Sequence, residues 1–257
     1  MYLERTNDRE LPADWVGDVC VWDIDKTYLD TRFSSVRGLL GIPFELAVDK
    51  RAVHGTVSLL RGLRHGPRDD SALTPLYFIS GSPTQMRKVV ERKMTMDGVQ
   101  FDGITFKDQW ALLKAGRPKG ITEQVGYKLQ ALLMYRREHP PGARYLLFGD
   151  DVERDLESFL LFGEVCAGLR GPKLLDRLRD MGVHKGDAIA ATSLADALPR
   201  ESDPVAHVFI HEVRGHRIHS TDPRVHAARD FADHARTLLA LGKLRDSDVA
   251  AVLAEPT

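Results

Sequence analysis

Two aspartates that lie two positions apart are the residues whose types and spacing point most directly to chemistry. Asp23 and Asp25 follow the apolar run VCVW. In an extended chain, residues i and i+2 project to the same side, so the two carboxylates should converge. A carboxylate can attack phosphorus to form an acyl phosphate, and a neighbouring carboxyl group can protonate the leaving oxygen and then deprotonate the attacking water. We therefore predict that Asp23 is a nucleophile and that Asp25 transfers the proton.

Such chemistry also needs groups that position the phosphate and neutralise its charge. Ser80 ends an apolar run in FISGSP, where its hydroxyl and the amides of Gly81 and Ser82 could meet a phosphate at the start of a helix. Lys128, near the beginning of a helical pattern, could reach the same oxygens, and Thr27 adds a hydroxyl beside the nucleophile. These residues are the predicted phosphate-binding groups.

Acids that follow another apolar run are candidates for a metal site. Asp150 and Asp155 occur in FGDDVERD, after the run RYLL. A carboxylate pair can hold Mg2+ through direct or water-mediated contacts. Asp151 is an alternative to either acid, but its side chain would point to the opposite side if the strand continued. The pattern therefore favours Asp150.

Each candidate also has a purely structural interpretation. An acid at a strand end, such as Asp25, is often a helix N-cap. A lysine on an amphipathic helix, such as Lys128, is usually just solvated, and Lys107 and Lys119 are alternatives for the cation. The occurrence of several such groups in order, most of them at strand ends, favours catalysis over these interpretations.

The motifs resemble those of the haloacid dehalogenase-like (HAD) superfamily. Asp23, Asp25 and Thr27 match its D-x-D-x-T signature. Ser80 matches its second motif and Lys128 its third. The fourth motif is matched by Gly149, Asp150 and Asp155. The resemblance extends over about residues 18–181. It implies an aspartyl-phosphate intermediate on Asp23, with Asp25 as acid and base, and Mg2+ held by Asp23, the backbone carbonyl of Asp25, and Asp150, with Asp155 securing it. An acid at the second position is typical of phosphatases and phosphotransferases in this superfamily.

A finer resemblance concerns the branch that includes the actin-patch-protein phosphatidate phosphatases. It rests on the string YFISGSP and the GDD-type fourth motif. The sequence departs from that branch in having GSP where SNSP is common, and Lys26 where a third acid is common. The expected activity is Mg2+-dependent hydrolysis of a phosphomonoester. Phosphotransfer by the same site and a non-catalytic HAD-like binding or regulatory module are the alternatives.

Short apolar runs that alternate with helical patterns predict the elements that position these groups. Strands are expected at residues 18–23, 75–80, 103–106, 144–149 and 164–167, with a sixth candidate at 188–191. Amphipathic helices are expected at residues 83–96, 123–138 and 152–162. This order predicts an α/β fold with a doubly wound, mostly parallel, Rossmann-like sheet.

The turn-rich stretch at residues 199–204 divides the chain into a HAD-like phosphatase core, 1–200, and a small helical C-terminal extension, 201–257, packed on the core. Two amphipathic helices are expected within residues 223–253. In this superfamily, cap modules are inserted between the first and second or the second and third motifs. The first interval is residues 28–74, with a helix expected at 44–63, and the second is residues 97–126. Neither interval is long enough for a full cap. A minimal cap is compatible with a bulky phosphorylated substrate such as a lipid headgroup, a phosphoprotein or a nucleic-acid end.

Six of the ten histidines fall between His207 and His234, and the string HEVRGH resembles a zinc-protease motif. That motif needs histidines four apart on one helical face, whereas His211 and His216 are five apart around a glycine. Surface and turn histidines, or a weakly basic patch at residues 214–219, explain this region better.

The composition excludes some partners. Lysine and arginine number 36 against 37 acidic residues, so no strong nucleic-acid signal is present. The two cysteines, Cys20 and Cys166, lie in apolar runs that we interpret as buried strands, which indicates core thiols rather than a disulfide framework. The sequence contains no apolar run long enough for a transmembrane segment and no signal-peptide pattern at its start, so a cytoplasmic protein is expected. The sequence does not predict the oligomeric state.

Overall fold

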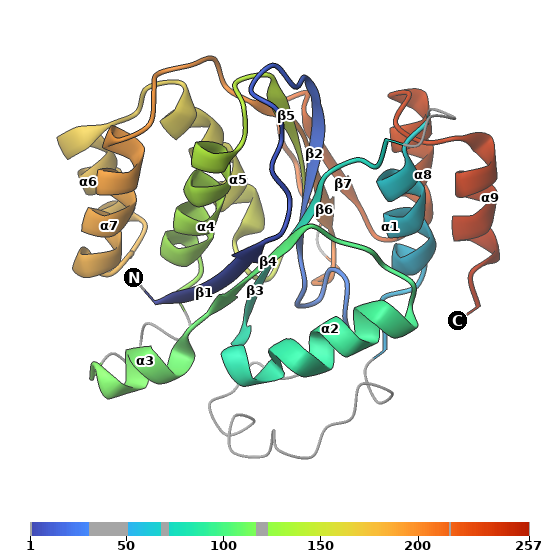
Figure 1. Ribbon diagram of the computed structural model, residues 1–257, viewed down its shortest axis with the longest axis horizontal. Coiled ribbons are helices and arrows are strands. Elements are labelled where there is room, and N and C mark those ends of the chain that lie inside the picture. Colours follow the sequence, from blue (N-terminus) through green and yellow to red (C-terminus); the bar gives the residue numbers. More distant parts are fainter. Residues whose placement is uncertain (1, 31–50, 68–71, 117–122, 216, 257) are drawn as a thin grey trace.

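The structure is a computed structural model that describes residues 2–30, 51–67, 72–116, 123–215 and 217–256. The described residues form a seven-stranded sheet with helices on both faces (Figure 1). The strands are β1 (Leu3–Asn7), β2 (Gly17–Asp23), β3 (Leu76–Pro83), β4 (Gly103–Lys107), β5 (Ala143–Asp150), β6 (Val205–His211) and β7 (Val225–Ala228). All neighbouring strands are parallel except β1 and β4. The predicted α/β fold with a mostly parallel sheet is confirmed.

The strand order identifies one position in the sheet as special. The order is β1-β4-β3-β2-β5-β6-β7, so the chain runs outward from β2 through β3 to β4 and then returns to start again at β5 on the other side. The strand order therefore reverses between β2 and β5. In open α/β sheets, ligands bind beyond the carboxyl ends of the strands at such a switch point.

Two sets of helices cover the sheet. On one side lie α4 (Val125–Glu138), α5 (Asp155–Cys166), α6 (Gly171–Asp180) and α7 (Lys185–Asp196), and on the other α1 (Thr56–His65), α2 (Arg87–Met96), α8 (Phe231–Ala240) and α9 (Asp246–Ala254). The short helices η3 (Thr84–Met86) and α3 (Gln109–Lys114) follow β3 and β4. In the described part of the chain, no helix is long and apolar enough to cross a membrane.

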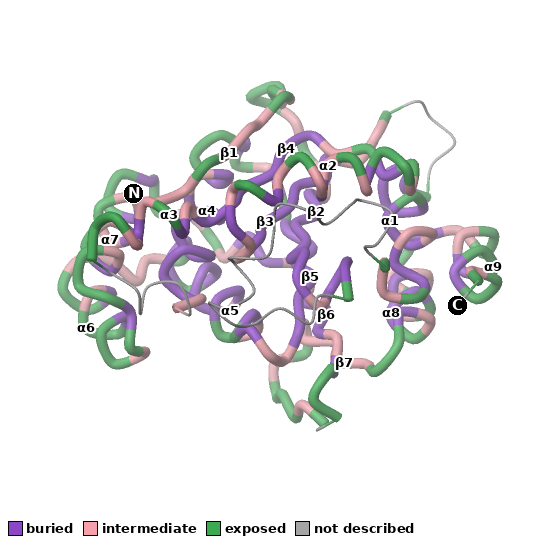
Figure 2. The backbone as a smooth tube through the Cα atoms, turned by 90° about the horizontal axis from the view of Figure 1, so that it is seen from below, coloured by how far each residue is buried: buried purple, intermediate pink, exposed green. Residues whose placement is uncertain are grey.

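The core consists of two layers because strand side chains alternate between the faces. In β2, Val19 and Val21 pack into the cluster under α4 and α5, whereas Cys20 and Trp22 pack into the opposite one. The Trp22 ring stacks on Phe148 of β5, with ring centroids 4.2 Å apart. Figure 2 shows the sheet as the buried centre of the molecule, with the exposed residues on the outer sides of the helices.

Two predicted strands are wrong. Residues 164–167 form the end of α5 and the residue after it, and residues 188–191 lie inside α7. A short apolar run looks the same in a buried helix as in a buried strand, and both helices bury such residues in the core cluster that they share with α4. Cys20 is buried in β2 as predicted, but Cys166 is a buried residue of a helix.

The segment after residue 200 contributes to the sheet itself. Its strand β6 pairs with β5 and its strand β7 pairs with β6, while α8 and α9 cover the face that also carries α1. The two helices predicted within 223–253 are therefore present, preceded by β7. In the region of the predicted minimal cap, residues 31–50 lie outside the described residues. Helix α1 begins at Thr56, after Gly55 in a left-handed conformation with φ 85°, rather than continuing a helix through 51–55.

A buried histidine in the second core layer should make stability depend on pH. His234 is 1% exposed and packs against Phe209 and Phe231, and burial lowers the pKa of its ring from 6.5 to about 3. The unfolded chain therefore binds a proton that the folded chain excludes. Burial of the neutral His234 ring contributes fully to the free energy of unfolding above the unfolded pKa. That contribution is lost as the pH falls toward the folded pKa.

We expect the His234→Leu variant to show a weaker pH dependence of the free energy of unfolding below about pH 6, by about 1.4 kcal/mol per pH unit. Urea titrations at a series of pH values measure this slope. His139, whose pKa burial lowers to about 4, should leave a residual slope in the variant. Equal slopes in wild type and variant would mean that the folded protein protonates His234 without cost.

Candidate active site

The structure brings the predicted chemical groups together at the switch point. Asp23 is the last residue of β2, Asp150 is the last residue of β5, and Ser80 lies near the end of β3, which is the other neighbour of β2. Asp25 follows β2 by two residues, and Lys128 extends from the first turns of α4. All five side chains are buried.

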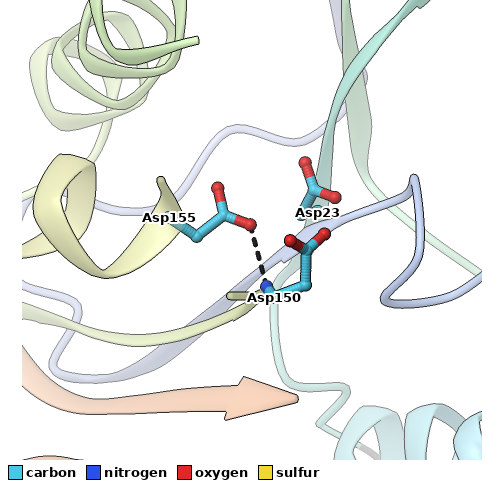
Figure 3. Close-up of side chains that lie close together, drawn as sticks. All are labelled: Asp23, Asp150 and Asp155. Carbon is cyan, nitrogen blue, oxygen red and sulfur yellow. Dashed lines mark hydrogen bonds between the residues drawn. The ribbon is translucent and has the colours of Figure 1, made fainter. Parts of the chain in front are cut away.

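Three carboxylates converge at the centre of this site (Figure 3). Asp23, Asp150 and Asp155 each offer one oxygen, and these oxygens lie within 4.8 Å of one another. Oδ2 of Asp23 and Oδ2 of Asp150 are buried and have no hydrogen-bond partner among the described residues. Buried carboxylate oxygens without a donor are costly, and a cation would satisfy them. The three residues therefore fit a metal ion.

The position of Asp155 depends on a glycine. Asp155 begins α5, and its Oδ2 accepts a hydrogen bond from the backbone N–H of Asp150 at 2.9 Å. A Cβ atom on Gly149 would lie only 2.4 Å from the same oxygen, so a side chain at this position would displace the carboxylate. Asp150 in turn accepts hydrogen bonds from the N–H groups of Val152 and Glu153, which fix the turn between β5 and α5.

Lys128 is the cation that faces the predicted nucleophile. Its Nζ lies 2.8 Å from Oδ1 of Asp23, forms a close ion pair with Asp155, and lies 3.4 Å from Glu153. Burial alone would lower the pKa of Lys128, but Asp155 and Asp23 raise it well above its ordinary value, so the ammonium stays charged. Of the two alternatives, Lys107 lies over the ring of Tyr127, and Lys119 is outside the described residues.

The site has more acids than cations. Five carboxyl groups, those of Asp23, Asp25, Asp150, Glu153 and Asp155, lie around the ammonium groups of Lys26 and Lys128, with Lys107 also near Glu153. Burial, together with this repulsion, raises the pKa of the three clustered aspartates, that of Asp150 to about 7. A divalent cation would offset the excess negative charge.

Asp25 is held by two serines. Ser80 Oγ donates to its Oδ2 at 2.9 Å and Ser82 Oγ donates to its Oδ1 at 2.8 Å. Burial, reinforced by the nearby carboxylate of Glu153, raises the pKa of Asp25. The carboxyl group is thus fixed in place, and its raised pKa favours the protonated form that a general acid needs.

The predicted phosphate loop differs from its expected form in one respect. Strand β3 continues through Pro83, so Gly81 and Ser82 lie in the strand and not in the first turn of a helix. The N–H of Ser82 donates to Ser80 Oγ at 3.0 Å, and the carbonyl of Gly81 accepts from Gln109. The Ser80 hydroxyl therefore serves Asp25 in this structure.

Thr27 is buried, and its hydroxyl has no hydrogen-bond partner among the described residues. It follows Lys26, whose backbone is in the left-handed region with φ 66° and whose Nζ lies 3.0 Å from Glu153. The sequence analysis did not identify the side chains of Ser82 and Glu153 as part of the site. The only available signal was their position inside the second and fourth motifs.

Asp151 is separated from the acid cluster, as its position beside Asp150 in the sequence predicted. Its carboxylate accepts hydrogen bonds from the N–H groups of Val213 and Arg214, in the loop after β6. His211 is the last residue of β6, so the string HEVRGH does not begin on a helix. His216 lies outside the described residues.

Comparisons with known proteins add no information about this site. No protein-family model matches the chain, and no curated protein and no solved structure shows significant similarity to it.

Proposed function

We propose that this protein is a Mg2+-dependent phosphomonoester hydrolase that acts through an aspartyl-phosphate intermediate on Asp23. The observation that carries the proposal is the pairing of two differently held acids. Asp23 faces Lys128 and has a carboxylate oxygen without a donor, whereas Asp25, two residues on, is fixed by two serine hydroxyls. This difference supports Asp23 as the nucleophile and Asp25 as the proton donor.

The first step transfers the phosphoryl group to the protein. An oxygen of the Asp23 carboxylate forms a bond to phosphorus while the bond between phosphorus and the leaving oxygen breaks. Asp25 gives its proton to that oxygen, which departs as an alcohol. Lys128 holds Asp23 and partly neutralises the phosphate, and Thr27 and the Gly81 amide are the proposed donors to its oxygens.

The second step releases phosphate. Asp25, now ionised, accepts a proton from a water molecule whose oxygen attacks phosphorus, and the bond to the Asp23 oxygen breaks. Asp23 regains its carboxylate and Asp25 regains its proton. Mg2+ held by Asp23, Asp150 and the backbone carbonyl of Asp25, with Asp155 beside it, would supply charge neutralisation for the phosphate oxygens.

The resemblance to the HAD superfamily supports the same assignment. The residues that match its motifs lie at the ends of three adjacent strands and at the beginnings of two helices around one point. The acid at the second position of the D-x-D-x-T signature is typical of phosphatases and phosphotransferases in that superfamily, and it supports phosphoryl chemistry over dehalogenation. The identity of the metal as magnesium is part of the proposal, because the set of donors is made of carboxylate oxygens, which Mg2+ prefers.

The experiment is hydrolysis of para-nitrophenyl phosphate with Mg2+, with a chelator, and with Mg2+ restored. We expect activity that the chelator removes and the metal restores. In a Mg2+ titration, Asp150→Asn should need at least about tenfold more metal for half-maximal activity, because a ligand is lost. Asp151→Asn is the matched control, since its carboxylate binds only the loop after β6, and it should titrate like the wild type. Full activity in the chelator would contradict the metal-dependent mechanism.

A further inference from the structure

Three polar side chains that the proposed mechanism does not use surround Gly81. Gln109, the first residue of α3, donates through Nε2 to the carbonyl of Gly81 at 2.6 Å. A Cβ atom placed on Gly81 would lie 3.0 Å from the hydroxyl of Tyr127 and 3.3 Å from Oε1 of Gln124. A side chain at Gly81 would therefore crowd Tyr127 and Gln124, and the three polar groups come from two elements, the first residue of α3 and the start of α4.

Each of these side chains has a polar atom left over. The Tyr127 hydroxyl, Gln109 Oε1 and Gln124 Oε1 are buried and have no hydrogen-bond partner among the described residues. Tyr127 is 4% exposed and Gln109 is 7% exposed. Buried polar atoms are normally paired, so three unpaired ones around a single residue indicate a ligand that pairs them.

The hydrogen-bonding character of two of the three atoms is defined. Because the amide nitrogen of Gln109 is bound to a carbonyl, the atom that remains is its oxygen, an acceptor. Burial raises the pKa of Tyr127 well above its ordinary value, so its hydroxyl keeps its proton and can donate. The ligand must therefore offer both donors and acceptors, as an alcohol group does.

The position of Gly81 relative to Asp25 identifies which part of a substrate would reach this point. Asp25 is held by Ser80 and Ser82, the residues on either side of Gly81. The leaving oxygen must come within hydrogen-bond distance of Asp25 to receive its proton. The atoms attached to that oxygen would then lie near Gly81, the residue that the three unpaired groups surround.

We propose that Gln109, Gln124 and Tyr127 form a leaving-group subsite that selects phosphomonoesters of hydroxylated alcohols, such as polyol and sugar phosphates. This inference rests on the proposed function and adds the class of substrate. An aryl or acyl leaving group would bury the three polar atoms without pairing them. Sites built to hydrogen-bond a hydroxyl discriminate strongly against analogues that lack it.

The test compares kcat/KM for glycerol phosphate and glucose phosphate with kcat/KM for para-nitrophenyl phosphate, which has no hydroxyl on its leaving group. Tyr127→Phe removes one oxygen and retains the ring beside Lys107. We expect this variant to lower the ratio of hydroxylated to aryl substrate about three- to tenfold, the effect of one lost hydrogen bond. Gln124→Leu, which removes an amide that does not cap α4, should lower the ratio in the same direction.

Tyr135→Phe is the matched control. Tyr135 lies two turns further along α4 and is buried as well, but its hydroxyl is paired with Thr105 at 2.9 Å. The selectivity ratio should not change in this variant. Unchanged ratios in Tyr127→Phe and Gln124→Leu, or a wild type that hydrolyses para-nitrophenyl phosphate but neither hydroxylated ester, would overturn the subsite alone. A wild type that hydrolyses none of the three with Mg2+ present would overturn the proposed function as well.

Discussion

Asp23→Asn should lose at least about a thousandfold in kcat for para-nitrophenyl phosphate, which corresponds to about 4 kcal/mol of transition-state stabilisation. An amide oxygen is neutral and far less nucleophilic than a carboxylate, so the step that forms the acyl phosphate has no substitute. The wild type, quenched in acid during turnover, should carry one phosphoryl group that hydroxylamine removes, as an acyl phosphate requires. Intact-protein mass spectrometry should find this group in the wild type and not in Asp23→Asn.

The same substitution at the other end of β2 is the control for Asp23→Asn. Asp18 lies in the same strand, but it pairs with Lys243 and Arg144 near the amino end of that strand, away from the candidate site. Asp18→Asn should keep its activity and its phosphoenzyme. Because Asp23 also belongs to the acid cluster, the assay is repeated at tenfold higher Mg2+, which should not restore Asp23→Asn. Substantial activity in Asp23→Asn would exclude Asp23 as the nucleophile.

The strands that carry the site could be predicted because each is a short apolar run bounded by polar residues. The runs at 18–23 and 144–149 became β2 and β5 with small changes at their ends. The run at 164–167 was misassigned because local pattern does not distinguish a strand from a helix that packs against a sheet. Its helical state follows from its position at the end of α5, whose apolar side faces the core.

Within the candidate site, only the residues that belong to sequence motifs could be predicted. Asp23, Asp25 and Asp150 were recognisable because the strand-end geometry acts within a few residues. The contact between Ser82 and Asp25 joins residues 57 positions apart, and Glu153 meets Lys26 across 127 positions. No local pattern specifies such pairs, since they depend on which strands become neighbours. The polar groups around Gly81 were missed for the same reason.

Asp25→Asn should separate the two halves of the reaction. Para-nitrophenolate is a weakly basic leaving group that departs without a proton, so the phosphoryl transfer to Asp23 should still proceed. The second step needs a base to activate water, and its loss should slow hydrolysis of the phosphoenzyme about 10²- to 10⁴-fold. Rapid mixing should therefore show a burst of nitrophenolate close to one equivalent per protein, followed by slow turnover.

The size of the Asp25→Asn burst distinguishes the role of Asp25 from a structural one. Asparagine can still bond to Ser80 and Ser82, so the loop should keep its form. The double variant Asp23→Asn with Asp25→Asn should show no burst, which would link the trapped phosphoryl group to Asp23. If Asp25→Asn turned over linearly from the first time point at a reduced rate, its effect would lie on formation of the phosphoenzyme. The assignment of Asp25 as the base of the second step would then be wrong, because a missing base slows only the step in which water attacks.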